Sequence, residues 1–409
     1  MESECQIAAA SFMNSSQPTR ADQIRIIPMP ASKNWKHLFC RSLAALAPRL
    51  SFTAHGHHLW PDISLDAQIA AWHDGATLAG KKWDRVLGPL WVEAQGHVAT
   101  ELNLPNPETI AFAGNAHDFL IRIVSALPRR PARILTSDQE FLSAMRQFRR
   151  WDESGAAVIS VAKSSEIVNV AAAGDFDLIY LSQVFYDTGL ESDWRQLASL
   201  ARPEGPWVVI DGYHGFMALP TDLSDVASHV FYIAGGYKYA MSGEGVGILH
   251  APPDFAPQPE ITGWFAQTGR SDPHRDHPVW FPEDARRFMG STFDPSGLYR
   301  FNAVRRMLAA ERLDTAMIAD HAWRLQTQFL QNAHLLDLEL ANHPGSRPGA
   351  RFLAYRGASA ETVRARLETK GIDVDAREQL LRIGFSVYHD AQDVERLIAA
   401  TWDHAADQC

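Results

Sequence analysis

An acid, a histidine and a lysine follow two apolar segments near the middle of the chain. Asp211 and His214 come directly after the run Pro-Trp-Val-Val-Ile, and Lys238 comes after the run His-Val-Phe-Tyr-Ile-Ala, with Gly235 and Gly236 before it. Both runs have the length and composition of buried strands. In an open parallel sheet, ligands bind beyond the carboxyl ends of the strands. We therefore expect the three side chains to lie at one site.

A lysine next to an acid is the combination that pyridoxal phosphate requires. The lysine amine forms a Schiff base, and the acid keeps the pyridine nitrogen protonated, so that the ring withdraws electrons from the substrate Cα. His214 follows Asp211 by three residues and can reach the cofactor hydroxyl or the aspartate. Taken singly, Asp211 could cap a turn and Lys238 could be a solvated loop residue. Together they favour a cofactor site.

Short apolar segments, rich in Val and Ile, recur along the chain from residue 133 to residue 250. Alternating strands and helices are typical of right-handed βαβ units and of a mostly parallel sheet covered on both faces. The expected strands are Arg133–Ser137, Ala156–Ala162, Phe176–Phe185, Trp207–Asp211, His229–Ala234 and Val246–His250, and the expected helices include Leu65–Leu90, Gln139–Trp151 and Trp194–Arg202.

The pattern of segments predicts three parts of the chain. Residues 1–50 form an arm that contributes to a small domain, residues 51–300 form a large cofactor-binding domain, and residues 301–409 form a small C-terminal domain. Within the last part, the periodicity predicts one long amphipathic helix from Leu298 to about Leu340, followed by a small α+β unit. The expected fold class is α/β, with a second, smaller α+β domain.

The motif Asp211-Gly-Tyr-His214, followed by Gly235-Gly-Tyr-Lys238 and a glycine-rich run over 242–247, resembles the class V aminotransferase family of pyridoxal-phosphate enzymes. The resemblance runs from about residue 50 to the C-terminus, and the kynureninase-like members are the most similar. It implies fold type I, in which a large domain has a mostly parallel seven-stranded sheet between helices, and a smaller α+β domain follows.

The resemblance also implies a role for each residue around the cofactor ring. Lys238 would form the Schiff base, and Asp211 would pair with the pyridine nitrogen. His214 would lie beside the ring, Phe141 would stack on it as in kynureninases, and Ser182 would line its face. Phe141 could equally be an ordinary core aromatic residue.

Other residues would hold the cofactor phosphate. Asn115 and Ala116 match a phosphate-binding turn before a predicted helix, where backbone N–H groups suit a phosphate dianion. Tyr237 would touch the phosphate, and Trp264 resembles a kynureninase tryptophan near it, although a core position is an alternative for Trp264. Thr292 resembles a residue that a partner subunit contributes, so the resemblance implies a homodimer with shared active sites.

Two further positions would contact an amino-acid substrate. Arg382 lies in an apolar run and matches the small-domain arginine that holds the α-carboxylate through a bidentate pair. The histidine cluster over 55–58 is interpreted as a loop that lines the substrate pocket, with His57 as the contact. A metal site is the alternative, but no carboxylate or cysteine lies at metal spacing, so we expect no metal.

The reaction type stays open between alternatives. Aminotransferase chemistry is the nominal class, and a kynureninase-like Cβ–Cγ hydrolase or a C–S lyase is the runner-up. A non-catalytic protein on the same fold is disfavoured because Lys238 and Asp211 are both present. Cysteines occur only at positions 5, 40 and 409. A persulfide mechanism that uses a loop cysteine in the C-terminal third is therefore not expected.

Composition excludes several classes of protein. The 409 residues carry a net charge of −10, which disfavours a nucleic-acid-binding protein. Hydrophobic residues make up 46% and charged residues 21%, which is ordinary for a globular chain. No apolar stretch approaches the roughly 20 residues that span a bilayer, and the first twenty residues do not resemble a signal peptide. The expected location is the cytoplasm.

Overall fold

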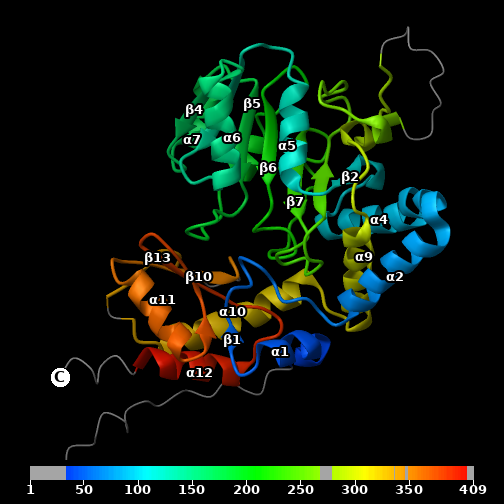
Figure 1. The fold of residues 1–409 in the computed structure, drawn as a ribbon. Helices are drawn as coiled ribbons and strands as arrows, with labels where there is room; N and C mark the ends of the chain where they lie inside the picture. The colour runs from blue at the N-terminus through cyan, green and yellow to red at the C-terminus, as the bar shows by residue number, and fades with distance from the viewer. Residues whose placement is uncertain (1–33, 268–278, 336, 346–348, 403–409) are drawn as a thin grey trace, which may run out of the picture.

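A seven-stranded sheet forms the centre of the larger lobe (Figure 1). The computed structural model describes residues 34–267, 279–335, 337–345 and 349–402. Neighbouring strands are parallel except where β8 pairs with β2 and β7. The mostly parallel sheet is thus confirmed. In spatial order its strands are β2 (Ile110–Ala113), β8 (Gly247–His250), β7 (Val230–Gly235), β6 (Trp207–Asp211), β5 (Leu178–Ser182), β3 (Ala132–Ser137) and β4 (Ala157–Ala162).

The central strands are buried along their whole length, whereas an edge strand is not. Every residue of β5, β6 and β7 is buried, which explains their continuous apolar sequences. The edge strand β4 exposes Val158 and Val161. The six expected strands correspond to β3–β8, while β2 was not expected.

Helices cover both faces of this sheet. Right-handed crossovers place α5 and α6 on one face and α7 and α8 on the other. The helices are α1 (Cys40–Leu46), α2 (Ile63–Leu78), α3 (Lys82–Arg85), α4 (Trp91–Leu102), α5 (Ala116–Ser125), α6 (Leu142–Glu153), α7 (Ile167–Ala173), α8 (Trp194–Ala198), α9 (Ser296–Ala310), α10 (Thr315–Asn332), α11 (Ala360–Thr369) and α12 (Ala391–Trp402). The helix expected over Leu65–Leu90 is interrupted after α2, and a π-helical turn, Val86–Leu90, contains Pro89.

The long helix expected from Leu298 to about Leu340 is two helices, α9 and α10. Arg312 adopts a left-handed conformation with φ of 56°, which ends the first helix. Asp314 then begins the second, because its side chain accepts a hydrogen bond of 2.7 Å from the N–H of Met317. An apolar periodicity that continues across a short break misled the sequence interpretation.

The smaller lobe lies below the sheet in Figure 1 and combines both ends of the described chain. Its antiparallel sheet has the order β12 (Asp375–Arg377), β13 (Leu380–Gly384), β10 (Phe352–Arg356) and β9 (Glu339–Leu340). A short strand near the N-terminus, β1 (Leu50–Ser51), pairs with β11 (Ile372–Asp373). Phe52 packs in the core of this lobe with residues of α10, α11 and α12. The division at residues 50 and 300 stays a prediction.

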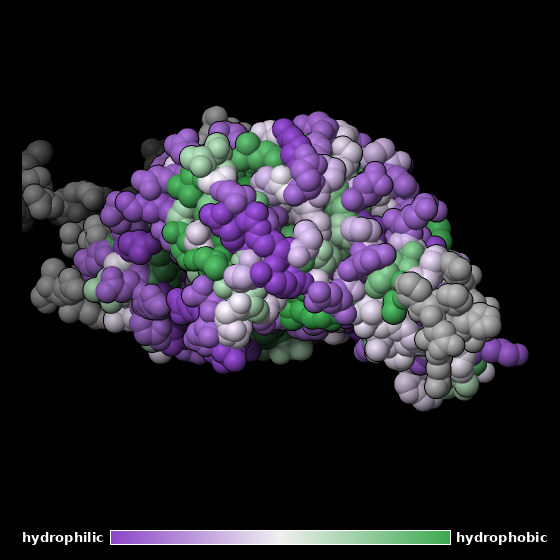
Figure 2. Space-filling model, turned by 90° about the horizontal axis from the view of Figure 1, so that it is seen from above, coloured by the Kyte–Doolittle hydropathy of each residue, from purple (hydrophilic) through white to green (hydrophobic). Residues whose placement is uncertain are grey.

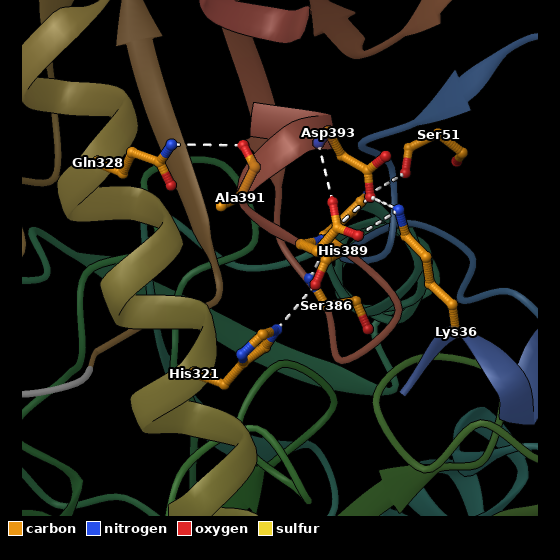
Figure 3. A network of polar contacts seen from close by, with 9 residues as sticks. Lys36, Ser51, His321, Gln328, Ser386, His389, Ala391 and Asp393 are labelled. Atoms are coloured by element: carbon orange, nitrogen blue, oxygen red, sulfur yellow. Dashed lines mark hydrogen bonds and ion pairs between the residues drawn. The ribbon is translucent and has the colours of Figure 1, made fainter. Parts of the chain in front are cut away.

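Hydrogen bonds and ion pairs connect Lys36 and Ser51, near the start of the described chain, to residues 386–393 of the smaller lobe (Figure 3). The Lys36 ammonium lies 2.7 Å from Asp390 and 2.8 Å from Asp393 at the start of α12. The N–H of Ser386 donates to Nδ1 of His389 at 3.0 Å, so Nε2 of His389 carries the proton that it donates to the Ser51 carbonyl at 2.8 Å. The segment that leads into residues 53–61 is therefore held in place.

The surface on one face of the molecule mixes hydrophilic and hydrophobic side chains. Seen from above, it is mostly hydrophilic, with hydrophobic areas between the hydrophilic ones (Figure 2). Among the residues that the structure describes, no helix has both the length and the apolar composition that crossing a membrane demands.

Candidate active site

A cavity of about 1240 Å³ opens where the carboxyl ends of β3, β5, β6 and β7 meet α5 and α6. Its size suits a cofactor together with a small substrate. Its lining includes residues from segments that are far apart in the sequence. Of the residues expected at the site, it brings together Asn115, Ala116, Phe141, Ser182, Asp211, His214, Tyr237 and Lys238.

Lys238 is buried at the wall of this cavity and follows the end of β7. Its amine forms a hydrogen bond with Nε2 of His214. The nitrogen also lies 5.7–5.8 Å from the centroids of the Phe141, Tyr213 and Tyr237 rings. The amine therefore meets apolar ring faces and one imidazole, with little access to water.

This environment changes the ionisation of the amine. Burial lowers the pKa of Lys238 to about 7; the charge of Asp211 opposes this decrease, and that of Arg382 adds to it. An ordinary lysine is almost fully protonated at neutral pH. A large fraction of Lys238 is therefore an unprotonated amine, which is the nucleophilic form.

Asp211 is buried at the end of β6 and is held by two donors. The Tyr180 hydroxyl donates to Oδ2, and the N–H of Tyr213 donates to Oδ1 at 2.9 Å. Burial raises the pKa of Asp211, while these two hydrogen bonds and the charge of Lys238 act in the opposite direction. The donors make a buried carboxylate tolerable, and it can hold a protonated ring nitrogen.

His214 leaves one ring nitrogen unused. It is buried, and burial together with the charge of Lys238 holds its pKa well below the usual range, so the ring is neutral. Its Nδ1 is buried and has no hydrogen-bond partner among the described residues. A buried polar atom without a partner is costly unless a ligand satisfies it.

Glu140 is a buried acid that sequence reasoning missed. Ser137 donates to its Oε1 at 2.6 Å, and the N–H and hydroxyl of Ser182 donate to its Oε2 at 3.0 and 2.5 Å. Burial raises the pKa of Glu140 to about 7, against the effect of these hydrogen bonds. The carboxyl group links the ends of β3 and β5 beneath the cavity. Its place directly before Phe141 was the available signal.

The turn before α5 is packed tightly against β8. Asn115 caps the helix by accepting a hydrogen bond of 3.0 Å from the N–H of Asp118. A Cβ on Gly247 would lie 2.3 Å from the Asn115 carbonyl carbon and 2.8 Å from the Ala116 nitrogen. Glycine at 247 thus permits a close approach that brings the start of α5 to the cavity wall, where its N–H groups can bind an anion.

Four expected site residues lie outside the lining of the cavity: Trp264, Thr292, His57 and Arg382. Trp264 is 60% exposed and stacks on Phe265. Thr292 is also exposed. His57 is exposed as well, but its ring stacks on that of Tyr237 with centroids 5.0 Å apart. His57 thus contacts a lining residue, whereas Trp264 and Thr292 are not among the lining residues.

Arg382 lies behind the cavity wall on β13. It is buried, and its guanidinium donates to the carbonyl of Tyr186, which does line the cavity, and to the carboxylate of Asp375. Asp375 was not expected at the site, because its contact depends on strand pairing in the small lobe. In the described part of the chain, no three His, Cys, Asp or Glu side chains are grouped to hold a metal.

Comparison with known families gives one match. The family described as Aminotransferase class-V matches residues 91–397, which covers both lobes. That range includes the cavity, Lys238, Asp211 and Arg382.

Curated relatives match over part of their length. A kynureninase from Deinococcus radiodurans is 28% identical over 236 residues, 55% of this chain and 56% of that protein. An isopenicillin N epimerase from Streptomyces clavuligerus is 29% identical over 159 residues, 36% of this chain and 40% of that protein. An 8-amino-7-oxononanoate synthase from Aeromonas hydrophila is 27% identical over 54% of this chain and 53% of that protein. The chain thus matches about half or less of the length of these relatives.

Solved structures share the fold over nearly the whole chain. The cysteine desulfurase CsdA from Escherichia coli has a TM-score of 0.75 at 18% identity, covering 91% of this chain and 97% of that one. A cysteine desulfurase from Thermococcus onnurineus has a TM-score of 0.75 at 16% identity, covering 93% and 100%. These likenesses confirm the expected two-domain fold type.

Proposed function

The chain belongs to the class V aminotransferase family, and we propose that it is a pyridoxal-phosphate-dependent enzyme that acts on an α-amino acid through Lys238. The observation that carries this proposal is that the buried Lys238 amine lies in one cavity with Asp211 and His214. Burial lowers the pKa of this amine to about 7. A solvated loop lysine would keep its ordinary pKa.

The side chains of the cavity fit this cofactor. Lys238 is the amine that binds its aldehyde carbon, and Asp211 is the carboxylate that holds its ring nitrogen. Phe141 supplies a ring face, and the unsatisfied Nδ1 of His214 can bond to a cofactor oxygen. The start of α5 at Asn115 offers N–H groups for the phosphate dianion.

The residues divide the chemistry between them. When bound, the cofactor supplies an electron-withdrawing ring that makes the Cα–H bond of an amino acid acidic. Asp211 retains a proton at the ring nitrogen because its carboxylate is fixed by Tyr180 and Tyr213. Lys238 would be the base placed to take the Cα proton of a bound amino acid, since its pKa lies near neutrality.

The candidate functions differ in the reaction that follows removal of the Cα proton. Aminotransferase chemistry is the function proposed first, in line with the family. Kynureninase-like hydrolysis of a Cβ–Cγ bond is the second, favoured by the kynureninase relative and by Phe141 in the cavity wall. A C–S lyase remains a third alternative, but it could not use a loop cysteine, because no cysteine lies between positions 41 and 408.

We also propose a homodimer in the cytoplasm. Leu65, Ile69 and Trp72 are exposed, and their spacing places them on one face of α2. Trp264 and Thr292 are exposed and are not among the residues that line the cavity, which supports a role toward a second copy. A Trp72→Glu change should lower the mass measured by light scattering from dimer to monomer. An unchanged mass would contradict this interface.

Spectroscopy with amino acids tests the proposed function. The purified protein with added pyridoxal phosphate should absorb visible light, and a preparation that stays colourless would contradict the proposal. Incubation with pools of amino acids then separates the reaction types. Accumulation of the amine form of the cofactor indicates transamination, whereas release of a side-chain fragment with the original spectrum restored indicates a hydrolase or lyase.

A further inference from the structure

Arg382 already has an anionic partner from its own chain. On the small-lobe sheet, Arg382 of β13 pairs in register with Asp375 of β12. The Asp375 carboxylate accepts a hydrogen bond from Nη2 of Arg382 and forms an ion pair with it. The Arg382 side chain is 4% exposed and the Asp375 side chain is 27% exposed, so water reaches the pair mainly from the side of Asp375.

Asp375 is held as an anion. Although burial would raise its pKa, the neighbouring His55, whose Nε2 lies 3.6 Å away, and the charge of Arg382 keep the pKa of Asp375 below its usual range. His55 contributes no charge near neutrality, because burial lowers its pKa to about 4. Near neutral pH, the Asp375 carboxylate is therefore charged and remains paired with Nη2 of Arg382.

A second cationic side chain, that of Arg377, lies near Asp375. Nε of Arg377 lies 3.8 Å from Oδ2 of Asp375, the atom that also pairs with Arg382, and the Arg377 side chain is half exposed. Both residues lie on β12, two positions apart, so their side chains share one face. If Asp375 left Arg382, it would not become a buried, unpaired charge.

The Nε–H group of Arg382 is an unsatisfied donor within the described part of the chain. Its Nε is buried and has no hydrogen-bond partner among the described residues. Its Nη1 donates to the carbonyl of Tyr186, which lines the cavity, so the guanidinium lies one residue behind the cavity wall. A carboxylate that arrived from the cavity would find an unsatisfied N–H and an existing cation.

We propose that Asp375 is an internal carboxylate that occupies Arg382 in the ligand-free protein and exchanges for the carboxylate of an incoming substrate, moving to Arg377. This inference deepens the proposed function, on which it rests, by making Asp375 a residue that sets substrate specificity. An amine without a carboxylate cannot displace Asp375 and gains nothing from Arg382. A substrate with a carboxylate must compete with Asp375, which weakens all such ligands by the same factor.

Binding equilibria test the exchange without relying on turnover. In the cofactor-free chain, acetate is the probe, and its affinity is measured by calorimetry. In the chain with pyridoxal phosphate, alanine and ethylamine are compared by the absorbance change at equilibrium. Asp375→Asn keeps the shape but removes the charge. Asp373→Asn is the matched control, because Asp373 pairs with the half-exposed Arg49 on the surface.

If Arg382 is available in about one molecule in ten, Asp375→Asn should strengthen acetate and alanine binding about tenfold. Ethylamine binding should stay unchanged, and Asp373→Asn should behave as the original protein. Unchanged or weaker acetate binding in Asp375→Asn would overturn the exchange. Asp375→Ser repeats the test if the asparagine variant does not fold.

The two hypotheses fail in different ways. Absence of any spectral change with pyridoxal phosphate counts against the proposed function, while the acetate titration still decides the exchange. A normal cofactor spectrum with no difference between Asp375→Asn and Asp373→Asn counts against the exchange alone.

Discussion

Tyr180→Phe should destabilise the protein in a pH-dependent way, because the hydroxyl of Tyr180 donates to the buried Asp211 carboxylate. A hydrogen bond to a charged group contributes about 1.5–3 kcal/mol, against about 0.5–1.5 kcal/mol between neutral groups. Tyr232→Phe is the matched control. Its hydroxyl is equally buried but donates to the neutral Gln183 amide at 2.8 Å.

The sign follows from the pKa of Asp211. Burial raises this pKa, so the folded state favours the protonated acid, and Tyr180 offsets part of that effect. Loss of the hydroxyl should raise this pKa further, because it removes one of the two donors to the carboxylate. The excess destabilisation is therefore present above the folded pKa of Asp211 and is lost as the pH falls through it.

Urea denaturation of the cofactor-free chain at pH 8 and pH 5 measures this difference. At pH 8, Tyr180→Phe should lose about 1 kcal/mol more of its free energy of unfolding than Tyr232→Phe, and the gap should narrow at pH 5. Equal losses for both variants at both pH values would refute the interpretation of Asp211 as an anion held by Tyr180. The same variant should also bind pyridoxal phosphate more weakly.

Two further outcomes are expected. Burial raises the pKa of Glu140 to about 7, so the free energy of unfolding should fall by up to about 3 kcal/mol as the pH rises from 4.5 to 7. In urea titrations, Glu140→Gln should abolish this dependence of the free energy of unfolding on pH. A dependence that persists in Glu140→Gln would contradict the role given to Glu140. Gly247→Ala should cost about 1–3 kcal/mol and weaken phosphate binding, because its Cβ would collide with Asn115. Gly114→Ala, where a Cβ meets nothing within 4 Å, is the control, and equal effects of the two changes would contradict the close packing at the turn.

The parallel sheet and the site residues at the ends of its strands could be predicted from the sequence. Asp211 and Lys238 could be predicted to lie at one site, because each follows a buried, continuous apolar run and parallel strands bring their carboxyl ends to one edge; Asp211 follows its run directly, and Lys238 follows after two glycines and a tyrosine. Asn115 was predicted from the family resemblance, which matches Asn115 and Ala116 to a phosphate-binding turn before a helix, and α5 begins at that turn. These features depend on a few neighbouring residues.

Contacts between distant segments could not be predicted in the same way. The pairing of Asp375 with Arg382 depends on the antiparallel register of two short strands in the small lobe. Glu140 meets Ser182 only because β3 and β5 are neighbours in the sheet. Likewise, Tyr180 was an ordinary strand residue until its pairing with β6 placed it beside Asp211.

The most direct test of the central claim is to locate the cofactor on the chain. The protein is incubated with pyridoxal phosphate, reduced with borohydride, digested and analysed by mass spectrometry. One phosphopyridoxyl group should be found on the peptide that contains Lys238. Lys163→Ala, which removes an exposed lysine, should retain the label, and Lys238→Ala should lose it. A label that persists at the same level in Lys238→Ala would contradict the claim that this lysine binds the cofactor.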